Sequence, residues 1–230
     1  MTQSHPVMQE NLDHYSLLAD LFVYPESDFG DRVRCVQNFL DDSFPEAGAR
    51  LEPFTEFAES ATTTELEELF LRSFDVQSIT TLDIGYVLFG DDYKRGAVLV
   101  NLNREHAQVS NPCNSELADH LPNVLRLLPL LADVEFRFEL VDRIVAPALR
   151  KIIGEFDPRK IDAKNKVYMR HHNTLIESSD EYGVLYQSPL QSLFAVLESD
   201  FELSDPQPPS ATSEFLKNID TEIQLEEVDA

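Results

Sequence analysis

The sequence predicts an all-α protein: a single helical bundle over residues 1–200, followed by a Pro-containing linker and an acidic tail over residues 201–230. Apolar residues recur at every third or fourth position along most of the chain, which is the period of an amphipathic helix. Only 7 of the 230 residues are Gly, which argues against a turn-rich β protein. No segment alternates with period two for long enough to predict a strand. With 43% hydrophobic residues, among them 15 Phe, the chain can fill a core of its own, although it has no Trp.

Four helices are expected in the first third of the chain, at residues 8–22, 29–40, 51–57 and 64–74. Apolar positions on one face define each of them. Pro25 and Pro45 are expected to end the first two, because proline breaks the helical hydrogen-bond pattern. Thr64 and Glu67 have the spacing of a capping box at the start of the fourth. Residues 79–89 remain open, since Ile79 to Leu82 are also compatible with extended structure.

Three helices are expected in the middle of the chain, at residues 92–106, 116–131 and 134–153. A polar loop at residues 110–114 separates the first two. The last two each contain an internal proline, Pro129 and Pro147, which should bend or break them.

The remaining segments are predicted from shorter patterns. A basic patch over residues 159–170 is expected to be a solvated helix face, and the neighbouring His171 and His172 would point about 100° apart on a helix and could not share one metal. A last core helix is expected at residues 189–197. Within the tail, apolar residues recur four apart, so residues 213–228 are predicted to form an acidic amphipathic helix that folds only on contact: Phe215, Ile219 and Ile223.

The charge of the chain restricts its partners. It carries 42 acidic and 18 basic residues, a formal net charge of −24. Such a field repels nucleic acids and anionic membranes and attracts cationic partners, so DNA binding is excluded. Two interpretations of the acidity stay open, namely adaptation to a salty cytoplasm and a dedicated surface for a basic partner.

Neither the cysteines nor the N-terminus indicates an extracellular or membrane protein. Cys35 and Cys113 form no disulfide scaffold or metal motif; we expect Cys35 to be buried and Cys113 to be partly exposed. Residues 1–6 lack a basic and apolar secretory pattern, and no run approaches the roughly eighteen apolar residues of a membrane span. We therefore expect a cytoplasmic protein without stable membrane insertion.

No catalytic constellation is present. The sequence has no glycine-rich phosphate loop, nucleophile elbow or His-x-x-x-His pair. The most concentrated polar group is Glu116, Asp119 and His120, which would share one face of the expected helix at 116–131. One explanation is capping, with Ser115 as the cap and the acids at the positive helix end. The other is a functional site.

Four segments, in this order, resemble the TorD/NarJ/DmsD family of redox-enzyme maturation chaperones, and most closely its nitrate reductase assembly branch. They are Tyr15 to Pro25, Leu69-Phe70 to Phe74-Asp75, Gly90-Asp91 to Arg95-Gly96, and Glu116-Leu117-Ala118-Asp119-His120-Leu121-Pro122. The resemblance covers residues 8 to about 200 and leaves the tail outside it.

The resemblance implies a TorD/NarJ-like helical bundle with no enzymatic activity, no metal and no cofactor of its own. It implies a cytoplasmic chaperone, a monomer or homodimer, that binds the N-terminal or twin-arginine signal peptide of a molybdopterin oxidoreductase catalytic subunit. Such a chaperone assists molybdenum-cofactor insertion before export or membrane docking. The peptide-binding residues would be Glu116, Asp119, His120, Leu121, Pro122, Asp91 and Arg95, with the carboxylates pairing with client Arg or Lys.

Two alternatives belong to other classes of protein. One is an all-helical interaction or scaffold protein without a molybdoenzyme client, and the other is a hydrolase that uses Asp and His.

Overall fold

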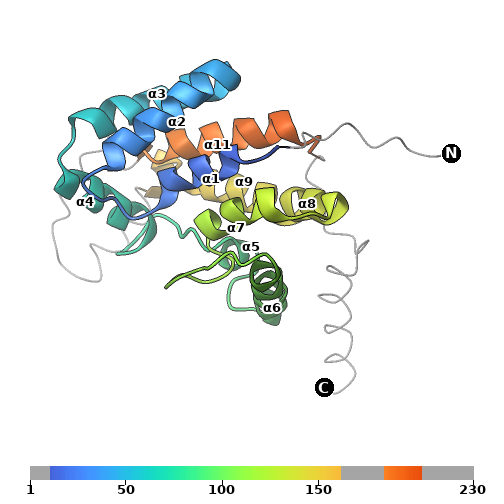
Figure 1. Cartoon of the computed structure of the whole chain (residues 1–230). Coiled ribbons are helices and arrows are strands. Elements are labelled where there is room, and N and C mark those ends of the chain that lie inside the picture. Colours follow the sequence, from blue (N-terminus) through green and yellow to red (C-terminus); the bar gives the residue numbers. More distant parts are fainter. Residues whose placement is uncertain (1–10, 162–183, 204–230) are drawn as a thin grey trace, which may run out of the picture. The chain divides into compact units, whose positions relative to one another are not determined.

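The structure, a computed structural model, describes residues 11–161 and 184–203. Within these ranges every regular element is a helix, and the strand-like pairing is limited to one isolated bridge between Asp83 and His120. This confirms the all-α prediction (Figure 1). The tail beyond residue 203, most of the basic patch, and the pair His171 and His172 lie outside the described residues.

The described chain divides into two compact units whose segments alternate along the sequence. Unit 1 consists of residues 11–19, 83–148 and 197–203, and unit 2 of residues 20–82, 149–161 and 184–196. The elements of unit 1 are α1 (His14–Leu18), α5 (Ile84–Phe89), α6 (Tyr93–Gln108), α7 (Leu121–Leu127), the 3₁₀ turn η2 (Leu128–Leu130), α8 (Val134–Leu140) and the π-helical turn η3 (Val141–Val145). Unit 2 contains α2 (Phe29–Ser43), α3 (Pro45–Ser60) and α4 (Thr63–Phe74). The division falls within η1 (Ala19–Phe22), α9 (Ala146–Glu155) and α11 (Gln187–Asp200).

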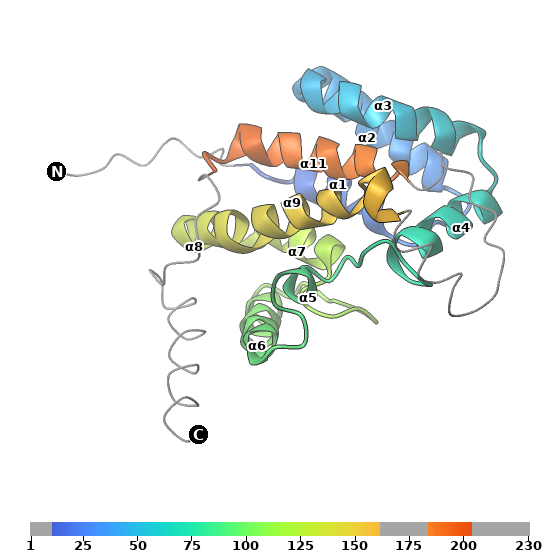
Figure 2. The ribbon, with the colours of Figure 1, turned by 180° about the vertical axis from the view of Figure 1, so that it is seen from behind.

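In unit 2, α2 and α3 lie side by side in both views of the ribbon (Figures 1 and 2). They are joined by the single residue Phe44, and Pro45 occupies the first turn of α3, where its missing N–H leaves no bond unmade. The helix therefore starts six residues before the predicted Leu51. Pro53 lies inside α3 on its exposed face, so the carbonyl that it leaves unpaired can bind water.

An aromatic cluster fills the core of unit 2. Tyr186 is almost fully buried, and its ring centroid lies 4.9 Å from that of Phe54, 4.7 Å from Phe74 and 6.0 Å from Phe70. Such tilted and edge-on pairs add to the gain from burial. The Phe residues thus fill this core without Trp, as predicted. Burial raises the pKa of the Tyr186 phenol far above its ordinary value.

In unit 1, α1 packs on α7 and η2, and α5 contacts α6 and η3. Tyr15 and Leu18 of α1 are buried, as are most side chains of α7. The first and last described segments are joined here, because the Asp200 carboxylate accepts hydrogen bonds from His14 Nε2 at 2.7 Å and from the Tyr15 hydroxyl at 2.9 Å.

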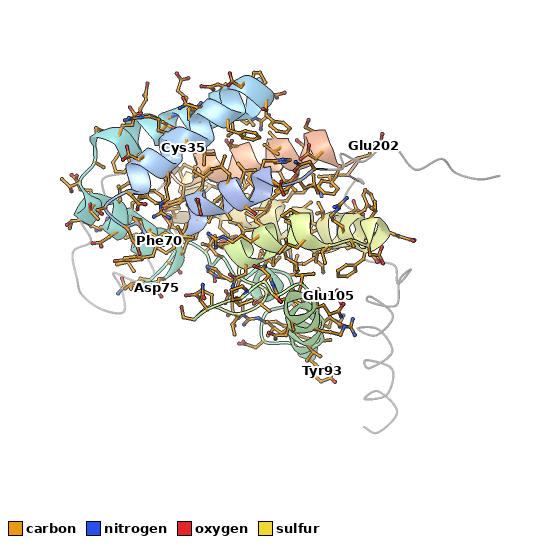
Figure 3. The ribbon with its side chains drawn as sticks, viewed as in Figure 1. Cys35, Phe70, Asp75, Tyr93, Glu105 and Glu202 are labelled. Carbon is orange, nitrogen blue, oxygen red and sulfur yellow. The ribbon has the colours of Figure 1, made fainter. Side chains whose placement is uncertain are left out.

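Three local predictions need correction. The capping box of α4 is formed by Thr62 and Glu65, two residues before the predicted pair, since each of three successive Thr hydroxyls could serve as the cap. Pro147 does not break the helix; the preceding turn widens to η3, and the Ala146 N–H donates to the Val141 carbonyl. Cys35 is exposed on α2 rather than buried (Figure 3).

The structure also answers the open question about residues 79–89 and the expectation about Cys113. The open segment at 79–89 contains a helix from Ile84, and Cys113 is partly exposed, as expected. Within residues 11–161 and 184–203, no helix has the length and apolar content that crossing a membrane requires.

Candidate functional site

The loop before α7 is the centre of the candidate site. The predicted helix start at Glu116 is wrong, because α7 begins at Leu121, and Ser115 therefore does not cap it. Pro122 falls in the first turn, where helices accept proline. The helix ends at Leu127 and η2 follows, with Pro129 in it. Glu116, Asp119 and His120 consequently lie in a loop, not on one face of a helix.

Four charged or ionisable side chains from three segments meet in this loop. Arg95, in the first turn of α6, donates from Nε to Asp119 Oδ2 at 3.1 Å and from Nη2 to Asp83 Oδ2 at 3.0 Å. The other oxygen of Asp83 accepts from His120 Nδ1 at 3.1 Å. The Glu116 carboxylate lies 4.0 Å from the same His120 nitrogen. We call Asp83, Arg95, Asp119 and His120 the Arg95 cluster.

The backbone brings these side chains together. Asp83 and His120 form an antiparallel bridge, and the Ile84 N–H donates to the Asp119 carbonyl at 3.0 Å. Gly85 follows directly, and a Cβ built on it would lie 2.6 Å from Asp119 Oδ2. A larger residue at position 85 would therefore displace the carboxylate that Arg95 binds.

Burial and neighbouring charges shift the pKa values of the two carboxyl groups of the Arg95 cluster in opposite directions. The Asp119 side chain is fully buried, and this desolvation raises the pKa of Asp119 although Arg95 opposes the rise. The hydrogen bond from His120 lowers the pKa of Asp83. Burial disfavours the charge on Arg95, but the carboxylates of Asp119 and Asp83 keep its pKa above the ordinary value.

A second polar group fixes the backbone of the same loop. Buried His106 donates from Nε2 to the Ala118 carbonyl at 3.1 Å, and its Nδ1 accepts from the Asn111 amide at 3.0 Å. The amide of Asn123 donates to the Leu117 carbonyl at 2.9 Å and, more weakly, to the carbonyl of Cys113 at 3.3 Å. Burial lowers the pKa of His106, in keeping with a neutral ring that donates at one nitrogen and accepts at the other.

The outward-facing residues of this region differ from its anchoring residues. The side chain of Glu116 is 56% exposed, and Leu117 next to it is 48% exposed. Tyr86 is also exposed, and the Arg95 guanidinium lies over its ring at 5.1 Å. The anchored loop thus presents one carboxylate and one apolar side chain to solvent, and the exposed ring of Tyr86 lies against the Arg95 guanidinium.

The seven predicted site residues therefore fall into different settings. Arg95, Asp119 and His120 belong to one cluster, with Glu116 at its exposed edge. Leu121 and Pro122 are buried in the core of unit 1. Asp91 is exposed, and the side chain that caps α6 is that of its neighbour Asp92, which accepts from the Lys94 N–H at 2.9 Å. A direct ion pair between Asp119 and a client cation would require this buried carboxylate to leave Arg95.

Sequence reasoning missed Asp83, Tyr86 and the buried amides. Asp83 precedes an apolar helical run, which is the position of a helix cap, but its side chain makes no capping bond. Among 42 acidic residues that position alone carries little weight.

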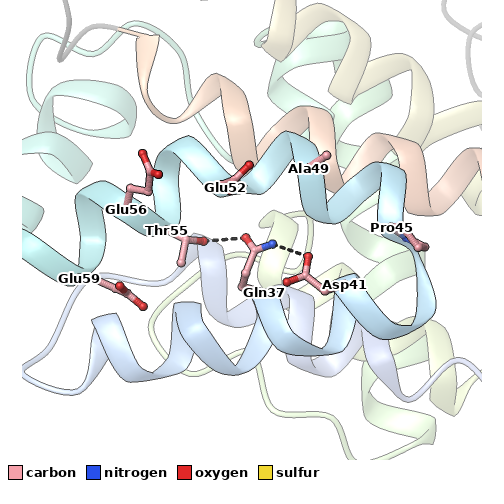
Figure 4. A pocket seen from close by; sticks show the side chains of 8 residues that line it. All are labelled: Gln37, Asp41, Pro45, Ala49, Glu52, Thr55, Glu56 and Glu59. Atoms are coloured by element: carbon pink, nitrogen blue, oxygen red, sulfur yellow. Dashed lines mark hydrogen bonds between the residues drawn. The ribbon is translucent and has the colours of Figure 1, made fainter.

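A groove between α2 and α3 is a rival site in unit 2 (Figure 4). It encloses about 380 Å³, and its lining includes four carboxylates, those of Asp41, Glu52, Glu56 and Glu59. Its inner polar side chains bond to one another: the Thr55 hydroxyl donates to Gln37 Oε1 at 2.9 Å, and Gln37 Nε2 donates to Asp41 Oδ1 at 2.7 Å. An anionic ligand would be repelled there.

A scan against protein-family models and a search of the curated proteins found no match for this chain. Within the described ranges, no group of three His, Cys, Asp or Glu side chains could hold a metal ion.

Proposed function

We propose that this protein is a cytoplasmic assembly chaperone that binds the N-terminal peptide of a molybdenum-cofactor oxidoreductase catalytic subunit and assists cofactor insertion. One observation carries the proposal. Two segments that resemble the TorD/NarJ/DmsD family, around Arg95 and around Asp119, are 24 residues apart in sequence, and their charged side chains meet at 3.1 Å. Motifs that matched by chance would have no reason to converge.

Some side chains of the site anchor the loop, and others are exposed where a peptide can contact them. Arg95, Asp119 and Asp83 hold the loop, and the buried amide of Asn123 fixes its backbone. A loop fixed in this way can bind a peptide without a large loss of conformational entropy. Such preorganisation suits recognition. The exposed Ser115 hydroxyl donates to the adjacent Glu116 carboxylate at 3.5 Å, which is too long and too solvated for an activated nucleophile.

The exposed residues fit a client of defined chemistry. Glu116 offers a charge for Arg or Lys, while Leu117 and Tyr86 offer apolar area. A basic amphipathic N-terminal peptide would place its apolar side on the two hydrophobic side chains and its cations near the carboxylate. The net charge of −24 would speed the encounter with such a peptide.

Affinity purification of the tagged full chain from its own cells tests the proposal. We expect a catalytic subunit that contains molybdopterin among the bound proteins, identified by mass spectrometry and by cofactor fluorescence. If the captured proteins never include such a subunit, the chaperone assignment is wrong, and the protein is better described as a helical interaction or scaffold protein.

Matched surface variants locate the binding site. Leu117→Ser should reduce recovery of the subunit at least several-fold, whereas Leu130→Ser, an equally exposed leucine of the same unit, should not. Glu116→Arg should weaken binding, with Glu135→Arg as the control for charge. Circular dichroism should be unchanged in all four, since none of these side chains is buried. Equal losses in variant and control would place the client elsewhere.

A further inference from the structure

The outer face of α6 is uncharged and exposed along its whole length. Every residue of this face is exposed: Tyr93, Gly96, Val100, Asn103 and Ala107. Val100 is 70% exposed and Tyr93 is 51% exposed, although both are large and apolar. We call these five residues the α6 stripe. Figure 1 shows α6 beside α5, and Figure 3 labels Tyr93 on it.

The spacing of the α6 stripe is that of a helix–helix seam. Its members follow one another at alternating steps of three and four, which keeps them in line along a helix that meets a second helix at a small angle. Gly96 and Ala107 leave shallow gaps on either side of Val100, into which larger side chains of a second helix could fit. The opposite face of α6 is already buried in unit 1, through Val98, Leu102 and His106.

The charge of α6 is opposite to that of the chain. It carries Lys94, Arg95 and Arg104 against Glu105, so its formal charge is 3 − 1 = +2 in a protein of net charge −24. Arg95 is occupied by its two carboxylate partners, and within the described residues Arg104 pairs with the adjacent Glu105 at 3.2 Å. Arg104, which directly follows Asn103, flanks the stripe as an exposed cation, whereas Lys94 lies about 100° around the helix from Tyr93.

We propose that residues 213–228 of the same chain dock on the α6 stripe as an acidic helix. This segment has apolar residues four apart, Phe215, Ile219 and Ile223, and it carries five acidic residues and one Lys. Such a helix is marginal alone in water and would gain stability by burying its apolar side. Its acids would lie near Arg104.

The covalent connection favours this occupant. The described chain ends at residue 203 in unit 1, the unit that contains α6. Residues 204–212 provide nine residues of linker, which extend to about 30 Å at 3.3 Å per residue. The described part of unit 1 has 82 residues, and a compact body of that size has a radius of gyration of about 12 Å. The linker can therefore reach most of its surface.

Charge argues against two other occupants. A second copy of the chain would bring the same uncharged stripe with its own Arg104 beside it, and so no acidic residue to pair with that cation. A basic client peptide would meet the exposed Arg104, so the α6 stripe is distinct from the client surface proposed above. Docking of the tail on the α6 stripe is therefore independent of the chaperone assignment.

Disulfide trapping in the full chain tests the docking. With Cys35→Ser and Cys113→Ser as the background, Val100→Cys is combined with Ile219→Cys and oxidised at low protein concentration. A tethered but undocked tail still collides with the whole surface at an effective concentration of about millimolar, so matched pairs must set the background rate. One control combines Glu135→Cys, on α8 of the same unit, with Ile219→Cys. The other combines Val100→Cys with Thr221→Cys.

We expect the Val100–Ile219 pair to close within one chain at least ten-fold faster than either control. Arg104→Glu should bring its rate down toward the controls. Equal rates in all three pairs would show that the tail does not dock on the α6 stripe. Disulfide-linked dimers in place of monomers would assign the α6 stripe to a second copy of the chain. An unchanged rate in the charge-reversed variant would refute the electrostatic argument.

Discussion

Removal of the Arg95 guanidinium should destabilise the protein far more than removal of any exposed cation of the same helix. In Arg95→Met the aliphatic stem is kept and the charge is lost. Asp119 then keeps a fully buried carboxylate without its cation, while Asp83, a quarter exposed, still accepts from His120. The loss falls mainly on Asp119.

The size of the effect follows from burial. Breaking a buried ion pair by removing one partner costs about 3–5 kcal/mol. Because 15% of the Arg95 side chain is exposed, we take the lower end, about 3 kcal/mol. For a chain of this length each kcal/mol lowers the unfolding midpoint by roughly 2–4 °C, so the expected decrease is roughly 6–12 °C.

Thermal unfolding followed by circular dichroism measures this change, and Arg104→Met is the matched control. Arg104 lies on α6 too, is 58% exposed and pairs with an adjacent acid. Such pairs contribute about 0–1 kcal/mol, so this variant should shift the midpoint by at most about 4 °C. Adding Asp119→Asn to Arg95→Met should restore part of the loss, because the buried negative charge is then absent.

Equal unfolding temperatures of the two single variants would refute a buried ion pair as the source of the loss. A further loss of stability when Asp119→Asn is added to Arg95→Met would also refute it, because the remaining buried carboxylate would then not be the cause.

Three further predictions concern single groups. Gly90 has φ +65° and ψ −139°, so Gly90→Ala should lower the free energy of unfolding in urea by about 1–3 kcal/mol. Gly96 lies inside α6 with open space around it, so Gly96→Ala should raise that free energy by about 0.5–1 kcal/mol. Tyr186→Phe removes a buried hydroxyl that has no hydrogen-bond partner among the described residues and should raise the free energy of unfolding by about 1 kcal/mol. Tyr15→Phe, which loses a bond to a carboxylate, should lower it by about 1.5–3 kcal/mol. The pKa of His106 lies below 6.5 in the folded state, so the unfolded chain binds more protons there and stability should fall as the pH drops below 6.5. His106→Gln should reduce the difference between urea midpoints at pH 7.5 and 5.5, and an unchanged difference would contradict this origin.

The helical class could be predicted because periodicity is local. The helix boundaries were harder to predict, because a proline can either break a helix or occupy its first turn. Pro122 reads equally as a residue that strains a helix and as one in its first turn, and the structure has the second. In the same way Pro147 is accommodated by a widened turn that no pattern of apolar residues encodes.

The candidate site was predictable only in part, because its geometry depends on contacts between distant residues. Asp119 and His120 stand out as neighbours before an apolar run, and Arg95 entered through the motif resemblance. Asp83 completes the cluster from a segment 37 residues before His120. No local pattern distinguishes Asp83 from the other acidic residues. The need for a glycine at position 85 is likewise recognised only from the structure, where the Asp119 carboxylate occupies the space that a Cβ would take.

The pairing of His14 with Asp200 sets the order in which the protein can be completed during synthesis. The two residues are 186 positions apart, and a ribosome that adds 5–20 residues per second needs roughly 10–40 s to make the chain between them. Throughout that interval α1 lacks its link to the last residues of α11. Packing of α1 on α7 and η2 becomes possible once Leu130 has been made, whereas its polar link to Asp200 can form only after the last turn of α11 has been added.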